Sequence, residues 1–245
     1  MNNPRIQKVN YHPDVRLSST QSSRKVQARL RILQSKLDFK NKVIWDLGCN
    51  GGFFSFSLAA QAKKIIAVDG DLELIEHNKM IQRELGISNI EFIHAPITTD
   101  LIDGLERADI TLFLAVFHHM MTVSSVYDWN QGVTTDSASQ LMDCINRCSN
   151  TLVFEIGYPN EGCDWCEKLP DYGHDWDDYV INNIFRGCYQ SVEAVMPAIR
   201  LNWCKKRIGS QLSVPYKEDS LFIRRIKRVL GFDARDLRKI YFGYK

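Results

Sequence analysis

Short apolar runs alternate with segments of helical periodicity in the first part of the chain. Five runs, rich in β-branched and aromatic residues, have the length of buried strands. They lie at residues 43–46, 64–68, 90–94, 110–117 and 151–156. Between them, residues 55–62 and 72–84 favour helices. Strands that alternate with helices predict an α/β fold built on a parallel sheet.

Both ends of the chain add elements to this pattern. Apolar side chains recur at helical spacing in residues 23–37, which predicts an amphipathic helix that covers a sheet edge. Residues 180–185 suggest another helix, and residues 191–196 and 239–244 are β-rich enough to form the last two strands. The stretch 197–238 is too long for a hairpin loop, so we expect a small added subdomain there.

The turn after the first strand is the most informative segment of the chain. Residues 43–54, with the sequence VIWDLGCNGGFF, read as a strand, a tight turn and the start of a helix. Glycines such as Gly48 and Gly52 let a ligand approach the backbone, and a helix N-terminus offers free N–H groups. Asn tolerates positive φ better than other non-glycine residues, so we expect Asn50 to fit this turn.

The spacing of this turn excludes two other ligand-binding loops. A phosphate-binding P-loop ends in Gly-Lys-Ser/Thr, whereas Phe53 and Phe54 follow Gly52 here. The dinucleotide fingerprint GxGxxG is also unmet, because Gly48 and Gly52 lie four residues apart. A plain βα turn that binds no ligand remains an open alternative from this segment alone.

The pattern Asp46-x-Gly48-x-x-x-Gly52 resembles motif I of the class I S-adenosylmethionine (SAM)-dependent methyltransferases. The resemblance covers about residues 42–158. It implies a doubly wound, mostly parallel seven-stranded sheet, the Rossmann-like methyltransferase fold, whose last two strands form an antiparallel pair at one edge. It also implies that the loop holds the methionine and ribose ends of SAM, which leaves as S-adenosylhomocysteine. In this family an acid at the end of the second strand, here Asp69, grips the ribose diol.

The sequence departs from the family pattern at two places. Asn50 stands where the family usually has a glycine, and the acid that often binds the adenine amino group near Pro96 is missing. Adenine recognition is therefore expected from the backbone and from Ile97 or Thr98. Asp71 is expected to cap the helix that follows the second strand. The resemblance implies a cofactor site formed by Asp46, Gly48, Cys49, Asn50, Gly52, Phe53, Asp69, Gly70, Pro96, Ile97 and Ala115.

Candidate catalytic residues follow the fourth and fifth strands. His118 and His119 come after the fourth run, which resembles the family's strand-four motif, where a His lies beside the transferred methyl. Glu155 closes the fifth run, and ligands in open α/β sheets bind beyond the carboxyl ends of the strands. We interpret His119 as the first choice for a general base and His118 as the second. Glu155 is expected to orient that His or the acceptor.

Charge is distributed unevenly although the net charge is only +2. Residues 1–42 carry ten Lys and Arg against two acids, and residues 217–245 carry nine against four. Residues 43–216 carry twelve against twenty-three. Basic ends suit contact with RNA or another anion, and they equally suit solvated helix faces.

The remaining composition indicates the cellular compartment of the protein and the state of its cysteines. No run approaches the length of a membrane span, and the first ten residues hold no apolar signal region, so we expect a cytoplasmic protein. The seven cysteines are then expected to be reduced. Cys163, Cys166 and His174 offer three zinc ligands, but their spacing matches no trusted zinc pattern, so no metal is predicted.

These observations predict a basic helical segment at 1–41 and a methyltransferase domain at 42–245. A lid insertion is expected at 158–178 and the added subdomain at 197–238. The predicted function is SAM-dependent O-methylation of a small-molecule or sugar hydroxyl by direct in-line transfer. Two alternatives stay open: an RNA or tRNA methyltransferase that uses the basic ends, and an inactive partner subunit with the methyltransferase fold.

Overall fold

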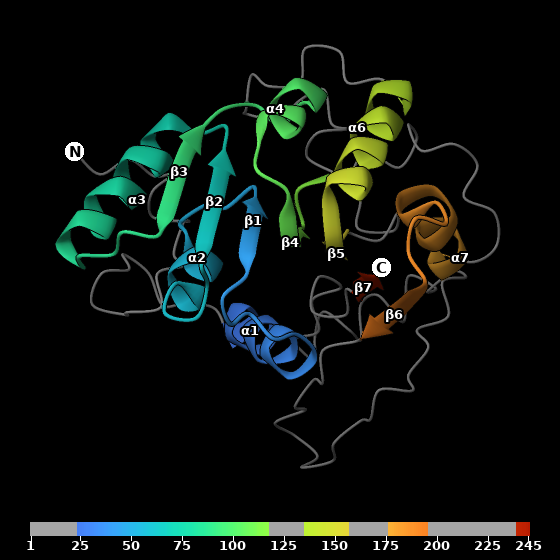
Figure 1. Cartoon of the computed structure of the whole chain (residues 1–245), viewed down its shortest axis with the longest axis horizontal. Coiled ribbons are helices and arrows are strands. Elements are labelled where there is room, and N and C mark those ends of the chain that lie inside the picture. The colour runs from blue at the N-terminus through green and yellow to red at the C-terminus, as the bar shows by residue number, and fades with distance from the viewer. Residues whose placement is uncertain (1–23, 118–134, 157–175, 196–238) are drawn as a thin grey trace, which may run out of the picture.

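A single mixed sheet organises the chain in the computed structural model (Figure 1). The structure describes residues 24–117, 135–156, 176–195 and 239–245. His118, His119 and the expected subdomain at 197–238 lie outside the described residues, as does all of the expected lid except 176–178.

Seven strands form the sheet in the order β3-β2-β1-β4-β5-β7-β6. The strands are β1 Val43–Leu47, β2 Lys64–Asp69, β3 Ile90–His94, β4 Ala108–Leu114, β5 Ser149–Glu155, β6 Ser191–Val195 and β7 Ile240–Tyr244. The first five pair in parallel, and β7 runs antiparallel to both β5 and β6. This order confirms the predicted doubly wound sheet and its antiparallel pair at one edge.

Helices cover both faces of the sheet. They are α1 Arg24–Lys36, α2 Phe53–Leu58, α3 Leu72–Glu84, α4 Thr99–Gly104, α6 Thr135–Cys148, α7 Trp176–Val180 and the π-helix Ile181–Phe185. Apolar residues of α1, α2 and α3 form one buried cluster with the sheet, and those of α4, α6, α7 and the π-helix form the other. Successive residues of β1 belong to opposite clusters, Ile44 to one and Trp45 to the other, as the pleat requires.

The N-terminal helix α1 is part of this core. Leu33 is fully buried in the same apolar cluster as Ile44 and Phe242, so α1 packs on a face of the sheet as well as reaching its edge. At the edge, Lys36 pairs with Glu193 of β6. An ion pair between exposed side chains of this kind contributes little, so the buried leucine is what holds the helix.

Two parts of the sequence prediction need correction. The fourth strand ends at Leu114 rather than at residue 117, because Ala115 adopts a positive φ of 60° that no strand continues through. The helices α4 and α6 were not predicted from the sequence. α4 has only six residues, too few for a periodic signal, whereas residues 135–148 do alternate apolar and polar positions at helical spacing, a signal that the sequence prediction did not use.

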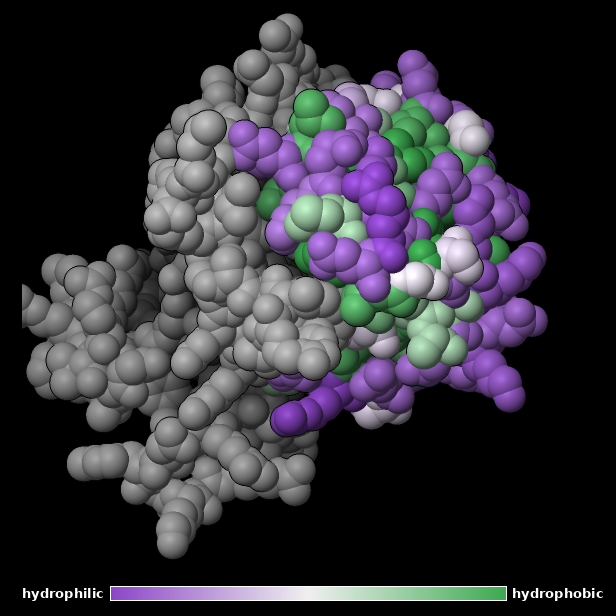
Figure 2. Space-filling model, turned by 90° about the vertical axis from the view of Figure 1, so that its left-hand side faces the viewer, coloured by the Kyte–Doolittle hydropathy of each residue, from purple (hydrophilic) through white to green (hydrophobic). Residues whose placement is uncertain are grey.

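The surface around α3 and β3 is mostly hydrophilic, with apolar groups scattered over it (Figure 2). Leu72, Met80 and Leu85 of this region are large apolar side chains that remain exposed, which is ordinary for single surface residues. Within the ranges that the structure describes, no helix combines the length and the apolar character needed to cross a bilayer.

Candidate active site

Three residues of the loop between β1 and α2 adopt the left-handed backbone conformation. Gly48 has φ 77°, Asn50 has φ 51° and Gly52 has φ 73°. The prediction that Asn50 fits this turn is therefore confirmed. The left-handed region suits Gly and Asn and strains most other residues, so the alternation of these three residues is what allows the tight turn.

The glycines of this loop are also required by space. A Cβ on Gly48 would lie 2.3 Å from a methyl carbon of Val116, in the segment after β4. A Cβ on Gly52 would lie 2.7 Å from the Phe56 ring. At these two positions the loop backbone therefore approaches its neighbours too closely for any side chain to fit.

Asp69, at the end of β2, anchors two backbone segments at once. Its Oδ2 accepts a hydrogen bond of 2.8 Å from the Asn50 backbone N–H, and its Oδ1 accepts one of 3.0 Å from the Asp71 N–H. The residue is only 5% exposed, and burial raises the pKa of its carboxyl. A carboxylate oxygen has a second lone pair, so Asp69 can hold the loop and still accept from a ligand hydroxyl.

Asn78 supports the loop from the α3 helix. Its Nδ2 donates to the Asn50 carbonyl over 2.7 Å, while the Asn50 Oδ1 accepts from the Gly51 N–H over 2.8 Å. Asn78 is fully buried, and its Oδ1 receives no hydrogen bond from the described residues. Sequence reasoning missed Asn78, although a polar residue in line with the apolar positions Leu74 and Ile81 was a usable signal.

Asp46 is a second buried acid beneath the loop. It is 4% exposed, and its Oδ2 accepts a hydrogen bond of 2.6 Å from Ser55 Oγ at the start of α2. Burial raises the pKa of Asp46 to about 6, although the Ser55 hydrogen bond lowers it, and the charge of Asp69 raises it slightly further. Two buried carboxylates that repel each other favour a cationic ligand, which would neutralise part of their charge.

Replacing Asp46 by Asn should stabilise the protein without ligand at neutral pH. The folded state keeps the Asp46 proton up to pH 6, whereas the unfolded chain loses it near pH 3.8. Stability from this group is therefore present below pH 4 and is lost as pH rises toward 6, by about 2–3 kcal/mol. Urea unfolding of Asp46→Asn should show a correspondingly higher free energy at pH 8 and a flatter slope between pH 4 and 7.

The exposed Asp38→Asn variant is the matched control and should unfold like the parent protein. An Asp46→Asn protein with the parent's pH dependence would show that the Asp46 carboxyl is ionised at an ordinary pH in the fold.

Cys49 lies within the same loop but is not a nucleophile. It is 5% exposed, and burial, followed by the charges of Asp46 and Asp69, raises the pKa of its thiol well above the ordinary value. A thiol that stays protonated is a small apolar side chain.

The end of β3 lies beside the ribose acid. The Ala95 N–H donates to the Asp69 carbonyl over 3.2 Å, and His94 Nε2 lies 3.1 Å from the Gly70 carbonyl. Ile97 is only 3% exposed and packs into the core, whereas Pro96 is exposed.

Thr98 caps the short helix α4. Its side chain accepts a hydrogen bond from the Leu101 N–H over 3.2 Å. The prediction that Ile97 or Thr98 recognises adenine stays a prediction.

Glu155 ties the end of β5 to two other segments. Its Oε1 pairs with Arg29 of α1 over 2.6 Å, and its carbonyl accepts a hydrogen bond of 2.8 Å from the Ala115 N–H. The Glu155 side chain is fully buried, so leaving it without Arg29 would cost several kcal/mol. Glu155 therefore fixes the turn that leads toward His118 and His119, which lie outside the described residues.

The geometry defines a class of protein. A glycine turn after β1, an acid that holds that turn from the end of β2, and a sheet with an antiparallel seventh strand together define the class I SAM-dependent methyltransferase fold. A family model described as a methyltransferase domain matches residues 38–180. The chain belongs to this family.

Individual relatives agree with the family. The chain is 26% identical over 137 residues to the O-antigen chain terminator bifunctional methyltransferase/kinase WbdD of Escherichia coli, which covers 52% of this chain and 17% of WbdD. It is 22% identical over 153 residues to the ubiquinone biosynthesis O-methyltransferase of Hahella chejuensis, with 62% of each protein covered. A match to the tRNA U34 carboxymethyltransferase of Desulfotalea psychrophila is 28% identical over 88 residues.

Solved structures show the same fold. A WbdD structure superposes with a TM-score of 0.60 at 18% identity and covers 99% of this chain and 41% of WbdD. Magnesium protoporphyrin IX methyltransferase from Synechocystis, solved with bound SAM, superposes with a TM-score of 0.52 at 15% identity and covers 91% of this chain and 79% of that protein. The sequence alignment with WbdD covers less than a fifth of that protein's length.

Proposed function

We propose that this protein uses SAM to methylate a hydroxyl group of a small molecule or a sugar. The observation that carries the proposal is the Asp69 carboxylate, which holds the Asn50 turn and lies where the family binds the cofactor ribose. The two buried acids, Asp46 and Asp69, suit a ligand that combines a ribose diol with cationic ammonium and sulfonium groups.

The residues of the loop divide the work of binding between them. Asp69 would accept hydrogen bonds from the ribose, and Asp46 would face the cationic methionine end through the base of the loop. Gly48, Asn50 and Gly52 would let the backbone approach the cofactor. The expected site is completed by Cys49, Phe53, Gly70, Pro96, Ile97 and Ala115.

Methyl transfer needs little chemistry from the protein beyond alignment. A sulfonium methyl is already reactive, so the main tasks are to hold the acceptor oxygen in line with the S–CH₃ bond and to exclude water. A hydroxyl acceptor also benefits from a base, for which we propose His119, with His118 as the second choice. The Arg29–Glu155 pair would fix the end of β5, whose Glu155 carbonyl holds the Ala115 N–H at the start of the segment that leads to these histidines.

One relative supports O-methylation of a small acceptor. The ubiquinone biosynthesis O-methyltransferase is covered over 62% of its length, and its name gives oxygen as the methylated atom. WbdD is named as an O-antigen chain terminator and a bifunctional methyltransferase/kinase, and because the match covers only 17% of it, its name supports methyl transfer without selecting the acceptor.

RNA is the second candidate acceptor. The match to the tRNA U34 carboxymethyltransferase covers 34% of this chain, and both ends of the chain are basic. A third candidate, an inactive partner subunit, is disfavoured because Asp46, Gly48, Gly52 and Asp69 are all retained.

A salt titration separates the two acceptor classes. If the basic ends bind RNA, each phosphate contact should add about −0.7 to the slope of log affinity against log salt for single strands. Reversing the charges of Arg24, Lys25, Arg224 and Arg225 should then flatten this slope and lower turnover. In an enzyme for small acceptors, the same four substitutions should leave the turnover unchanged, and RNA binding should show no such salt dependence.

A methyl-transfer screen tests the proposal itself. Labelled SAM should pass its methyl group to a component of a metabolite pool and not to RNA, and the product should be a methyl ether formed together with S-adenosylhomocysteine. Methylation confined to the RNA pool would assign the second candidate, and transfer to neither pool would favour the inactive subunit.

A further inference from the structure

Two helices bring three side chains with potential metal-ligand atoms together at the end of the sheet opposite the proposed cofactor site. Asp103 lies on α4, and Cys144 and Cys148 lie one turn apart on α6. One ligand atom from each, a carboxylate oxygen and two sulfurs, all lie within 4.8 Å of one another.

The position of this cluster follows from the topology. The C-terminal ends of α4 and α6 lead directly into the amino ends of the parallel strands β4 and β5. The β1–α2 loop and Asp69 lie instead at the carboxyl ends of β1 and β2. Cys148 is the residue that immediately precedes β5. The cluster is therefore separate from the residues proposed to bind the cofactor.

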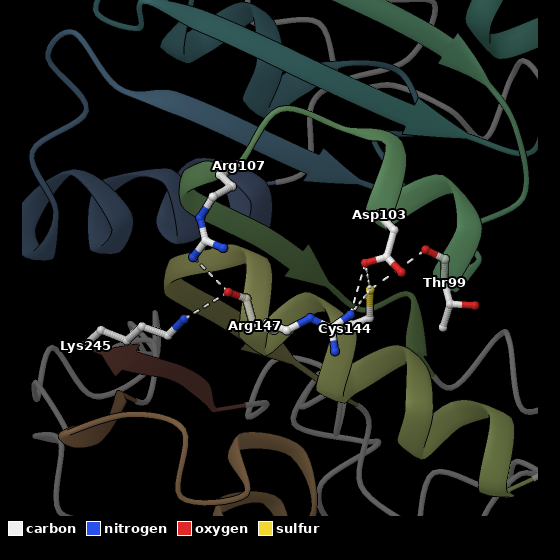
Figure 3. Close-up of polar contacts among 6 residues, drawn as sticks. All are labelled: Thr99, Asp103, Arg107, Cys144, Arg147 and Lys245. Carbon is white, nitrogen blue, oxygen red and sulfur yellow. Dashed lines mark hydrogen bonds and ion pairs between the residues drawn. The ribbon is translucent and has the colours of Figure 1, made fainter.

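The contacts inside the cluster already join the two helices. Cys144 Sγ donates a hydrogen bond of 3.0 Å to Asp103 Oδ1 and lies 3.8 Å from the Thr99 carbonyl (Figure 3). Cys144 is 2% exposed, and Cys148 is partly buried, so both sulfurs lie in a sheltered position beside an exposed carboxylate. A metal ion between these atoms would replace a hydrogen bond that is already in place.

The cluster also attracts positive charge. Arg147 Nη2 lies 3.0 Å from Asp103 Oδ1 and 3.5 Å from Cys144 Sγ (Figure 3). The Arg147 side chain is 62% exposed, so it can rotate away from the cluster into solvent. Two further cations, Arg107 and Lys245, donate to the Arg147 backbone carbonyl.

We propose that Asp103, Cys144 and Cys148 form a binding site for a thiophilic divalent cation of the zinc type. Thiolate ligands select zinc and its heavier relatives over magnesium and calcium, which prefer oxygen. Three protein ligands leave one position of a tetrahedral ion for water. Binding exchanges the two thiol protons, which pass to solvent, for one divalent cation, and no electron is transferred.

The site has a structural role in this proposal. An ion held by α4 and α6 links the two helices on one face of the sheet, and it stabilises the fold because only the folded chain brings the three ligands together. Methyl transfer itself should not depend on the ion.

Cadmium provides a direct probe, because cadmium–thiolate bonds absorb in the ultraviolet. The reduced full-length protein with Cys163→Ser and Cys166→Ser serves as the parent, so that the other close cysteine pair does not contribute. The parent should bind one Cd²⁺ per chain and show the thiolate band. At free Cd²⁺ about a hundredfold above the dissociation constant, its Tm should rise by about 5–10 °C.

Variants of single ligands test the assignment. Cys148→Ser and Asp103→Asn should each weaken Cd²⁺ binding at least about tenfold, whereas Asp100→Asn, on the same helix, should bind like the parent. Mg²⁺ should not raise the Tm. A parent that binds no Cd²⁺, or binding that survives either ligand substitution unchanged, would overturn the three-ligand site.

Discussion

His119→Ala should lower turnover about 10²–10⁴-fold while SAM affinity stays close to that of the parent protein. A positioned base removes the proton of the acceptor hydroxyl as the oxygen attacks, and its loss affects the transition state rather than cofactor binding. The parent's rate should also fall as pH drops below the ordinary histidine pKa of about 6.5, since only neutral imidazole accepts a proton. Single-turnover rates at saturating SAM measure both effects.

His118→Ala is the matched control, because the two histidines are neighbours in the sequence. The turn at Ala115 changes the direction of the chain after β4, so a strand alternation cannot decide which His faces the acceptor. A loss confined to His118→Ala would transfer the role of base to that residue. Full turnover in both variants would leave alignment alone as the mechanism.

Asn50→Val should reduce SAM affinity by roughly a hundredfold or more. Valine is β-branched and is strained at the φ of 51° that Asn50 adopts, and it cannot accept the hydrogen bond from Gly51 N–H. Together these losses are worth about 2–4 kcal/mol, enough to shift the Asn50 N–H that Asp69 holds. Calorimetric titration of SAM, with circular dichroism to confirm the fold, measures the loss.

Asn50→Gly separates the contribution of the backbone conformation to SAM affinity from that of the Asn50 side chain. Glycine accepts positive φ without strain and loses only the side-chain hydrogen bond, so affinity should stay within a few-fold of the parent. Strong binding by the Val variant would mean that the turn does not contact the cofactor.

The sequence predicted those features of the site that local chemistry determines. A positive φ at position 50 follows from Asn between glycines, and the place of Asp69 follows from a β-rich run that ends in an acid. The cap of α3 by Asp71 was predicted correctly for the same reason, since its Oδ1 accepts from the Glu73 N–H. Such features depend on neighbours in the sequence and on the backbone preferences of single residue types.

Features that depend on distant segments were not predicted. The Arg29–Glu155 pair joins residues 126 positions apart, and the Asn78 contact with the Asn50 carbonyl spans 28. Ala115 has a positive φ although alanine does not favour it, and its N–H donates to the carbonyl of Glu155, a residue 40 positions away in the chain. The cluster of Asp103 and Cys144 likewise exists only once α4 and α6 lie together.

Titration of SAM into the parent protein and into Asp69→Ala tests the central claim most directly. The parent should bind one SAM per chain. Asp69→Ala should bind at least about tenfold more weakly, because a charged acceptor for the ribose diol and the anchor of Asn50 N–H are both lost. Asp71→Ala, which removes only the cap of α3, should stay within a few-fold. A parent that binds no SAM, or an Asp69→Ala variant with the parent's dissociation constant, would contradict the account.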